Sequence, residues 1–137
     1  MVSKDLQKKY MQLQMLKKQL EALAEQKTEL DERVSELTHT INAIRKLGDI
    51  KKGEEIWSSF GASSFVRSDI KDIDKILIGV GAGVLLKKKR SEAIELLHSR
   101  LDELNGIDKE LTAEIGKYIE QINIIEPEVQ RLAEKEQ

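Results

Sequence analysis

Two short patterns in this sequence contain residue types that bind anions. The run GVGAG, residues 79–83, resembles a glycine-rich phosphate loop. Such a loop holds phosphate where it opens a helix after a strand, because backbone N–H groups and the helix terminus then face the anion. Here the apolar run Val84–Leu86 follows instead, so we interpret the glycines as a hairpin turn. The second pattern, Lys87–Arg90, could bind nucleic acid or act as an import signal, or simply form a solvated collar, which the net charge of −2 favours.

Residues that could bind metal or catalyse a reaction are sparse. His39 and His98 are the only histidines and the chain has no Cys, so the usual transition-metal ligands do not cluster. No serine has a histidine partner defined by a motif, and the carboxylates lie mainly on polar helix positions. We therefore expect no metal, no cofactor and no enzymatic activity.

The composition describes long solvated helices better than a thick globular core. Charged residues make up 35% of the 137 residues, aromatic residues 4%, and there is one Pro. The N-terminal residues lack an apolar signal core, and no run of about 18 apolar residues could cross a membrane. Together with the absence of Cys, this predicts a soluble cytoplasmic protein.

Apolar residues recur in steps of three and four over residues 6–44. This spacing persists through six heptads and is typical of a coiled coil, with only Lys9 and Lys27 interrupting the apolar seam. We expect Ser3 to cap this helix at its N-terminus and Gly48 to end it. The a positions are Leu6, Leu13, Leu20, Lys27, Val34 and Ile41, and the d positions are Lys9, Leu16, Leu23, Leu30, Leu37 and Ile44.

The heptad pattern returns after Ser91, a candidate N-cap, and Asp108 is its one polar interruption. Pro127 falls at an outward f position, where we expect it to kink the last turns. The a positions are Ile94, Leu101, Asp108, Ile115, Ile122 and Val129, and the d positions are Leu97, Leu104, Leu111, Tyr118, Ile125 and Leu132.

Two helices of equal length suggest an antiparallel coiled coil. If facing residues have numbers that sum to about 138, every a position meets a d position. Lys27 and Asp108 then lie in adjacent layers with opposite charge. They either pair, and so fix the register, or each extends separately to solvent.

Residues 48–90 break the heptads and contain four short apolar runs separated by turn-like stretches, which predicts two β-hairpins. Apolar residues lie on both faces of the strands, and an isolated hairpin is marginal in water. We therefore expect this segment to assemble with other subunits into a β-barrel or sandwich. The expected assembly residues are Ile56, Trp57, Phe60, Phe65, Val66, Ile76, Ile78, Val80, Val84 and Leu86.

The order helix, two hairpins, helix resembles the α-type subunits of the prefoldin family. The similarity lies in EIWSSFGASSFV (55–66), DKILIGVGAGVLLKK (74–88) and SEAIELL (91–97), and it covers essentially the whole chain. Ser59 departs from the family, which often has Pro before that turn. The expected fold is α+β and mostly α, a single domain made of helix 1–47, the hairpin segment 48–90 and helix 91–137.

The resemblance also implies a function. In prefoldins, two α and four β subunits form a hexamer with a double β-barrel base, from which six coiled coils extend. Their distal ends hold unfolded protein without ATP and pass it to a group II chaperonin. By this resemblance the chain is a molecular chaperone subunit whose partners are β-type prefoldin subunits, unfolded proteins and the chaperonin.

The substrate should bind where the two helix ends meet, opposite the hairpins. Several apolar residues there lie off the seam, and we expect Lys9 and Pro127 to let the helices separate and uncover seam residues such as Leu13. Scattered surface apolar residues are, however, ordinary in soluble proteins. The expected substrate-binding residues are Leu6, Tyr10, Met11, Leu13, Met15, Ile124, Ile125, Val129 and Leu132.

Two other classes of function remain open. A coiled-coil scaffold would oligomerise through the same hairpins but bring fixed partners together, each in a defined apolar groove. An RNA-binding helical arm, like those of some aminoacyl-tRNA synthetases, should carry basic residues along one helix face. Lys and Glu are interleaved in this chain, which disfavours the RNA-binding arm.

Overall fold

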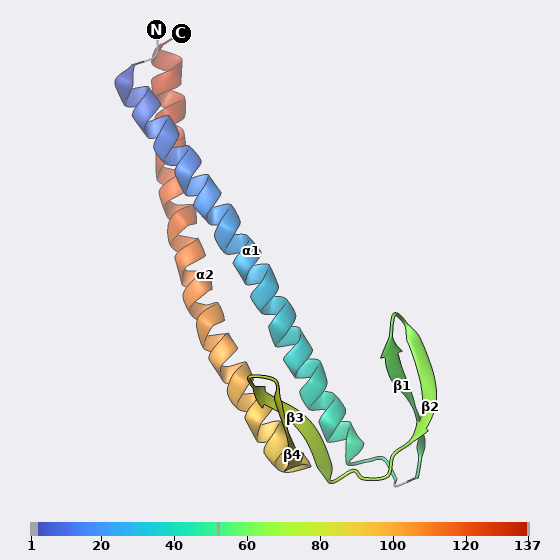
Figure 1. The fold of residues 1–137 in the computed structure, drawn as a ribbon. Helices are drawn as coiled ribbons and strands as arrows, with labels where there is room; N and C mark the ends of the chain where they lie inside the picture. Colours follow the sequence, from blue (N-terminus) through green and yellow to red (C-terminus); the bar gives the residue numbers. More distant parts are fainter. Residues whose placement is uncertain (1–2, 52, 137) are drawn as a thin grey trace. The chain divides into compact units, whose positions relative to one another are not determined.

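The chain consists of a long helix, two β-hairpins and a second long helix, in that order (Figure 1). The computed structural model describes residues 3–51 and 53–136. The elements are α1 (Lys4–Leu47), β1 (Glu55–Gly61), β2 (Ser64–Asp69), β3 (Lys75–Gly81), β4 (Val84–Lys89) and α2 (Arg90–Lys135). This confirms the expected mostly α, α+β fold with two hairpins. The chain divides into two compact units, residues 1–34 with 104–137, and residues 35–103.

The helix α1 begins as the sequence indicates, whereas α2 does not. The backbone N–H of Leu6 donates to Ser3 Oγ at 3.1 Å, so Ser3 caps α1. Arg90 opens α2 directly after β4, with its N–H donated to the Asp74 carbonyl. Ser91 therefore lies in the first turn of α2, and its expected role as the N-cap was wrong because the strand runs into the helix without a loop.

In the first unit, residues 1–34 and 104–137, the two helices bury one apolar seam. Its core is formed by Leu13, Leu16, Ile122 and Val129, with Leu30 and Leu111 also buried. Leu6, Leu20, Tyr118 and Ile125 pack against this core while remaining partly exposed. All of these residues were assigned to a or d positions, which confirms the heptads in this unit.

Two of the three polar seam residues in the first unit, Lys27 and Asp108, pair with one another. Lys27 Nζ donates to Asp108 Oδ1 at 2.8 Å and lies 3.3 Å from Asp31 Oδ2 on the next turn of α1. The hydrogen bond to Asp108 is the largest cause that raises the pKa of Lys27. Of the two expected alternatives, the structure therefore confirms pairing and not separate extension to solvent. This pairing is possible only in the antiparallel register.

Changing this pair tests its part in setting the register. We expect Asp108→Leu alone to lower Tm by several degrees, because it leaves the Lys27 charge at the seam without its interhelical partner. Adding Lys27→Leu should restore Tm to the starting value or above, since two apolar residues then meet. Thermal unfolding of the two single variants and the double variant measures this coupling. Additive effects of the two changes would contradict a direct interaction.

In the second unit, residues 35–103, the hairpin β3–β4 packs on the helices. Ile78 of β3 is buried with Ile41 and Ile44 of α1 and with Ala93 and Leu97 of α2. Ala93 has no exposed surface, so its small side chain lets the strand approach the helix closely. Arg100 on α2 adds a polar anchor by donating from Nη2 to the Gly79 carbonyl.

Both hairpins are antiparallel and carry a register shift next to the turn. In β1–β2, Glu55 faces Asp69 and Ser59 faces Phe65 before the shift. In β3–β4, the turn passes through Ala82 at φ 52°, flanked by glycines with positive φ. The run GVGAG is therefore a hairpin turn, as expected. Within the described residues each hairpin forms its own two-stranded sheet, and this single chain closes no barrel.

Candidate assembly and substrate-binding surfaces

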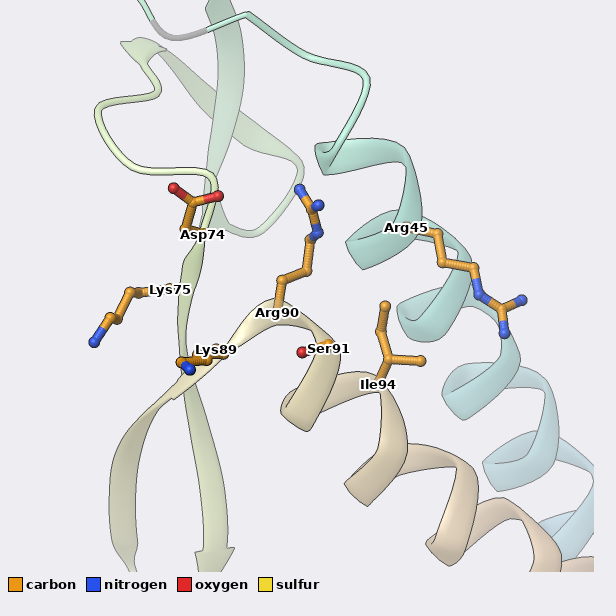
Figure 2. A pocket seen from close by; sticks show the side chains of 7 residues that line it. All are labelled: Arg45, Asp74, Lys75, Lys89, Arg90, Ser91 and Ile94. Carbon is orange, nitrogen blue, oxygen red and sulfur yellow. The ribbon is translucent and has the colours of Figure 1, made fainter.

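The second unit has an open hollow of about 600 Å³ that is lined by charged and polar side chains and by Ile94 (Figure 2). The two arginines that line it make contacts between segments. Arg90 Nη1 donates to the Ile73 carbonyl at 3.3 Å, and Arg45 Nη2 lies 2.8 Å from His98 Nε2. Gly48 lies against the Arg90 side chain, since a Cβ on Gly48 would be 2.9 Å from the guanidinium carbon. Arg45 and Arg90 thus have structural contacts beside the hollow.

The hairpin β3–β4 has one face toward the helices and one toward solvent. Ile76 and Ile78 point to the helices, and Ile78 is only 8% exposed. Leu77 lies on the opposite face of β3, 63% exposed, and Leu85 of β4 lies on that same face, 59% exposed. The register also places Gly79 opposite Leu85, which leaves the two leucine side chains as the apolar part of this face.

The structure covers one of the assembly residues that were expected from the sequence. Ile78 is covered by its own chain and cannot serve as an exposed contact. Leu77 and Leu85 are exposed although they were not among the expected residues. Alternation along β3 puts Leu77 on the other face of the strand from Ile76 and Ile78. Val80, Val84 and Leu86, which were expected, are exposed.

The hairpin β1–β2 exposes apolar side chains on both faces. Trp57 and Phe65 lie on one face, and Val66 lies on the other. Arg67 stacks over the Trp57 ring at 5.4 Å from its centroid, while its Nε lies 3.3 Å from Glu55 Oε2. A two-stranded sheet that exposes apolar residues on both faces needs cover from outside.

Among the described residues of the first unit, four apolar residues near the helix ends are more than half exposed, and we call them the terminal surface. They are Tyr10, Met11, Met15 and Ile124. The helices are closed beneath them, because Leu13 is only 4% exposed and Val129 is also buried. Leu6, Ile125 and Leu132 are half-buried.

The expected separation of the helix ends is therefore wrong for this structure. Lys9, which was expected to disrupt the seam, instead pairs with Glu128 of α2. Lys17 Nζ lies 3.3 Å from Glu126 Oε1, and the Glu136 carboxylate accepts the Ser3 N–H at 2.9 Å. A long lysine side chain can leave an apolar seam and reach a carboxylate, which is why its charge did not open the helices.

These interhelical contacts surround the proline of α2. Pro127 has no N–H to donate to the Asn123 carbonyl, yet α2 continues through it to Lys135. The carboxylates on either side, Glu126 and Glu128, are the two that pair with α1. The Lys9 ammonium lowers the pKa of Glu128 below its ordinary value. The stabilising contribution of the Lys9–Glu128 pair is therefore fully present above the ordinary glutamate pKa. It is lost as the pH falls through the lowered pKa of Glu128.

The exposed apolar residues of the first unit do not form one patch. Heptad positions place Met11 and Met15 on the outer side of α1, and Ile124 on the outer side of α2. Ile107 and Ile119 are exposed as well and were not expected. Their spacing puts them on the flanks of the seam, at g and e positions, and not on the outer b, c and f positions.

Within the described residues, two long helices are joined by two hairpins that expose apolar side chains. The family model for prefoldin subunits matches residues 16–135, and this chain belongs to the prefoldin family. With its two hairpins it resembles the α-type subunits, and the prefoldin family is a non-enzymatic chaperone family.

Named relatives and a solved structure agree with this assignment. The prefoldin subunit alpha of Methanosarcina barkeri is 32% identical over 100 residues, 73% of this chain and 69% of that protein. The prefoldin subunit alpha of Archaeoglobus fulgidus is 26% identical over 133 residues, 97% of each chain. The cryo-EM structure of the filamentous PFD of Methanocaldococcus jannaschii superposes with a TM-score of 0.74 at 18% identity, covering 85% of this chain and 96% of that one. Within the described residues, neither helix is long and apolar enough to span a membrane.

Proposed function

We propose that this chain is a cytosolic prefoldin α subunit that holds unfolded proteins without nucleotide and delivers them to a group II chaperonin. The observation that carries the proposal is that the hairpins and the helix ends expose apolar side chains on surfaces of different geometry. The hairpins expose flat strand faces, whereas the helix ends expose methionines and an isoleucine on curved helix surfaces. The first suits permanent assembly, and the second suits loose contact with varied chains.

Assembly is the role that we assign to the hairpins. Both faces of β1–β2 and the outer face of β3–β4 carry exposed apolar residues, among them Trp57, Leu77 and Leu85. Strands from β-type prefoldin subunits would cover these faces and pair with the free strand edges. An arrangement of two α and four β subunits follows from the family resemblance.

Substrate capture is the role that we assign to the terminal surface. Methionine side chains are flexible and polarisable, so they adapt to apolar segments of different shape. Because the seam beneath is closed, the outer residues make the first contact and Leu13 stays in the core. The glycine-rich turn lies in a hairpin, so it offers no helix N-terminus to nucleotide phosphate.

Reconstitution tests this function. The full chain is mixed with an archaeal β-type prefoldin subunit, and native mass spectrometry and aggregation of several unrelated denatured proteins are measured without ATP. We expect a hetero-oligomer that suppresses aggregation of all of them. A chain that never recruits the β-type subunit would contradict the assembly role. Binding of only one of the proteins would indicate the fixed-partner scaffold instead.

A further inference from the structure

The outer side of α1 carries an ordered stripe of lysines and methionines. Lys4, Lys8, Met11, Met15 and Lys18 follow one another in steps of four, three, four and three residues. This spacing places all five on the same helix face, at c and f positions opposite the seam. All five side chains are exposed, and the methionines are 66% and 62% exposed.

The five lysines of residues 4–18 fall into two sets with different contacts. Lys9 and Lys17 pair with Glu128 and Glu126 of α2 and so belong to the interhelical contact. Lys4, Lys8 and Lys18 instead border the two methionines on both sides. The stripe therefore presents an apolar centre between cationic ends.

We propose that this stripe selects unfolded segments in which a short apolar run is flanked by acidic residues. The inference rests on the proposed holding function and names the substrate class that α1 prefers. Lys8 and Lys18 are ten residues apart, about 15 Å along the helix axis. An extended peptide covers that distance with about four to five residues, so the apolar run should be of that length with carboxylates at its ends.

Charge complementarity favours a short acidic–apolar peptide over a long polyanion such as a nucleic acid. A long polyanion would extend past the stripe onto Glu25 and Glu29, which follow Lys18 on the same c and f positions of α1 and are exposed. It would also leave Met11 and Met15 uncovered. A peptide with an apolar centre and acidic ends can contact both the methionines and the lysines of the stripe.

The test uses the full chain in the oligomer that it forms and three fluorescent peptides with the same four-residue apolar centre, flanked by glutamates, serines or lysines. We expect the glutamate peptide to bind about threefold to tenfold more tightly than the serine peptide, the range for a few exposed ion pairs. The preference should shrink as salt rises to 0.5 M.

Two variants separate this inference from the proposed function. Lys4→Gln/Lys8→Gln/Lys18→Gln should abolish the preference for glutamate flanks and keep binding of the serine peptide. Met11→Ser/Met15→Ser should weaken binding of all three peptides. A control with equal loss of charge, Lys46→Gln/Lys71→Gln/Lys109→Gln, should keep the preference, since these exposed lysines lie outside the stripe.

Equal binding of the three peptides by the unchanged chain would overturn the inference and leave the holding function intact. A preference that survives the Lys4/Lys8/Lys18 variant, or that disappears in the charge control, would also overturn it. A single-stranded oligonucleotide serves as the polyanion probe. If it binds as tightly as the glutamate peptide and is insensitive to the methionine changes, the stripe is a polyanion site. Failure of every peptide to bind would contradict the holding function itself.

Discussion

A variant with Leu77→Asp and Leu85→Asp is expected to remain folded as a subunit but to lose assembly with β-type partners. Both side chains lie on the face of β3–β4 that points away from the helices, so the change leaves the cluster around Ile78 intact. Covering two carboxylates in an interface costs several kcal/mol even though Lys87 lies across the strand pair from position 77, because desolvation of a buried ion pair can exceed its attraction. The oligomer population should therefore fall by more than tenfold. Native mass spectrometry of the mixed subunits measures this loss.

The matched control replaces the same leucines by valine. Valine keeps the face apolar and suits a strand, so Leu77→Val/Leu85→Val should still assemble. Circular dichroism of both variants should show the helix content of the unchanged chain. If the aspartate variant assembles normally, the outer face of β3–β4 is not a subunit contact and the assembly role fails.

The second large effect is expected at the terminal surface. Met11→Ser/Met15→Ser/Ile124→Ser should require roughly tenfold more oligomer to suppress aggregation, because three exposed apolar contacts are lost. The oligomer should form as before, since all three side chains lie outside the seam and outside the hairpins. Aggregation of a denatured protein, followed by light scattering over a range of oligomer concentrations, gives the comparison.

Ile107→Ser provides the control for this variant. Ile107 is also an exposed isoleucine of the first unit, but it lies beside Leu30 and Arg33 in a separate shallow hollow. It should leave suppression nearly unchanged. Equal losses from Ile107→Ser and from the triple variant would mean that general surface apolarity, and not the terminal surface, holds the substrate.

The helical part of the fold was predictable from the sequence because a heptad seam is a local, repeated signal. Leu16, Ile41, Leu97 and Ile122 are all buried where their a or d positions require. The pairing of Lys27 with Asp108 followed from the same register. Two opposite charges in adjacent layers of an otherwise apolar seam are close enough to pair, and pairing keeps both away from the apolar residues.

The predictions were wrong where the position of a side chain depends on tertiary contacts. Alternation shows that Ile78 and Leu77 lie on opposite faces of β3, but contact with Ala93 and Leu97 decides which face is covered. Lys9 was expected to open the seam, yet a carboxylate of α2 is within its reach. In both cases the outcome depends on contacts with residues far away in the sequence, so the neighbouring residues in the chain do not indicate it.

The most direct test of the central claim places a photo-crosslinking amino acid at Met15 or, in a separate variant, at Glu29. Both positions are exposed and two heptads apart on the same outer side of α1, so they differ in their neighbours and not in their orientation. With a denatured protein bound to the assembled oligomer, we predict strong crosslinks from position 15 and few from position 29. Equal crosslinking from both positions, or none from position 15, would contradict the claim that the terminal surface holds unfolded protein.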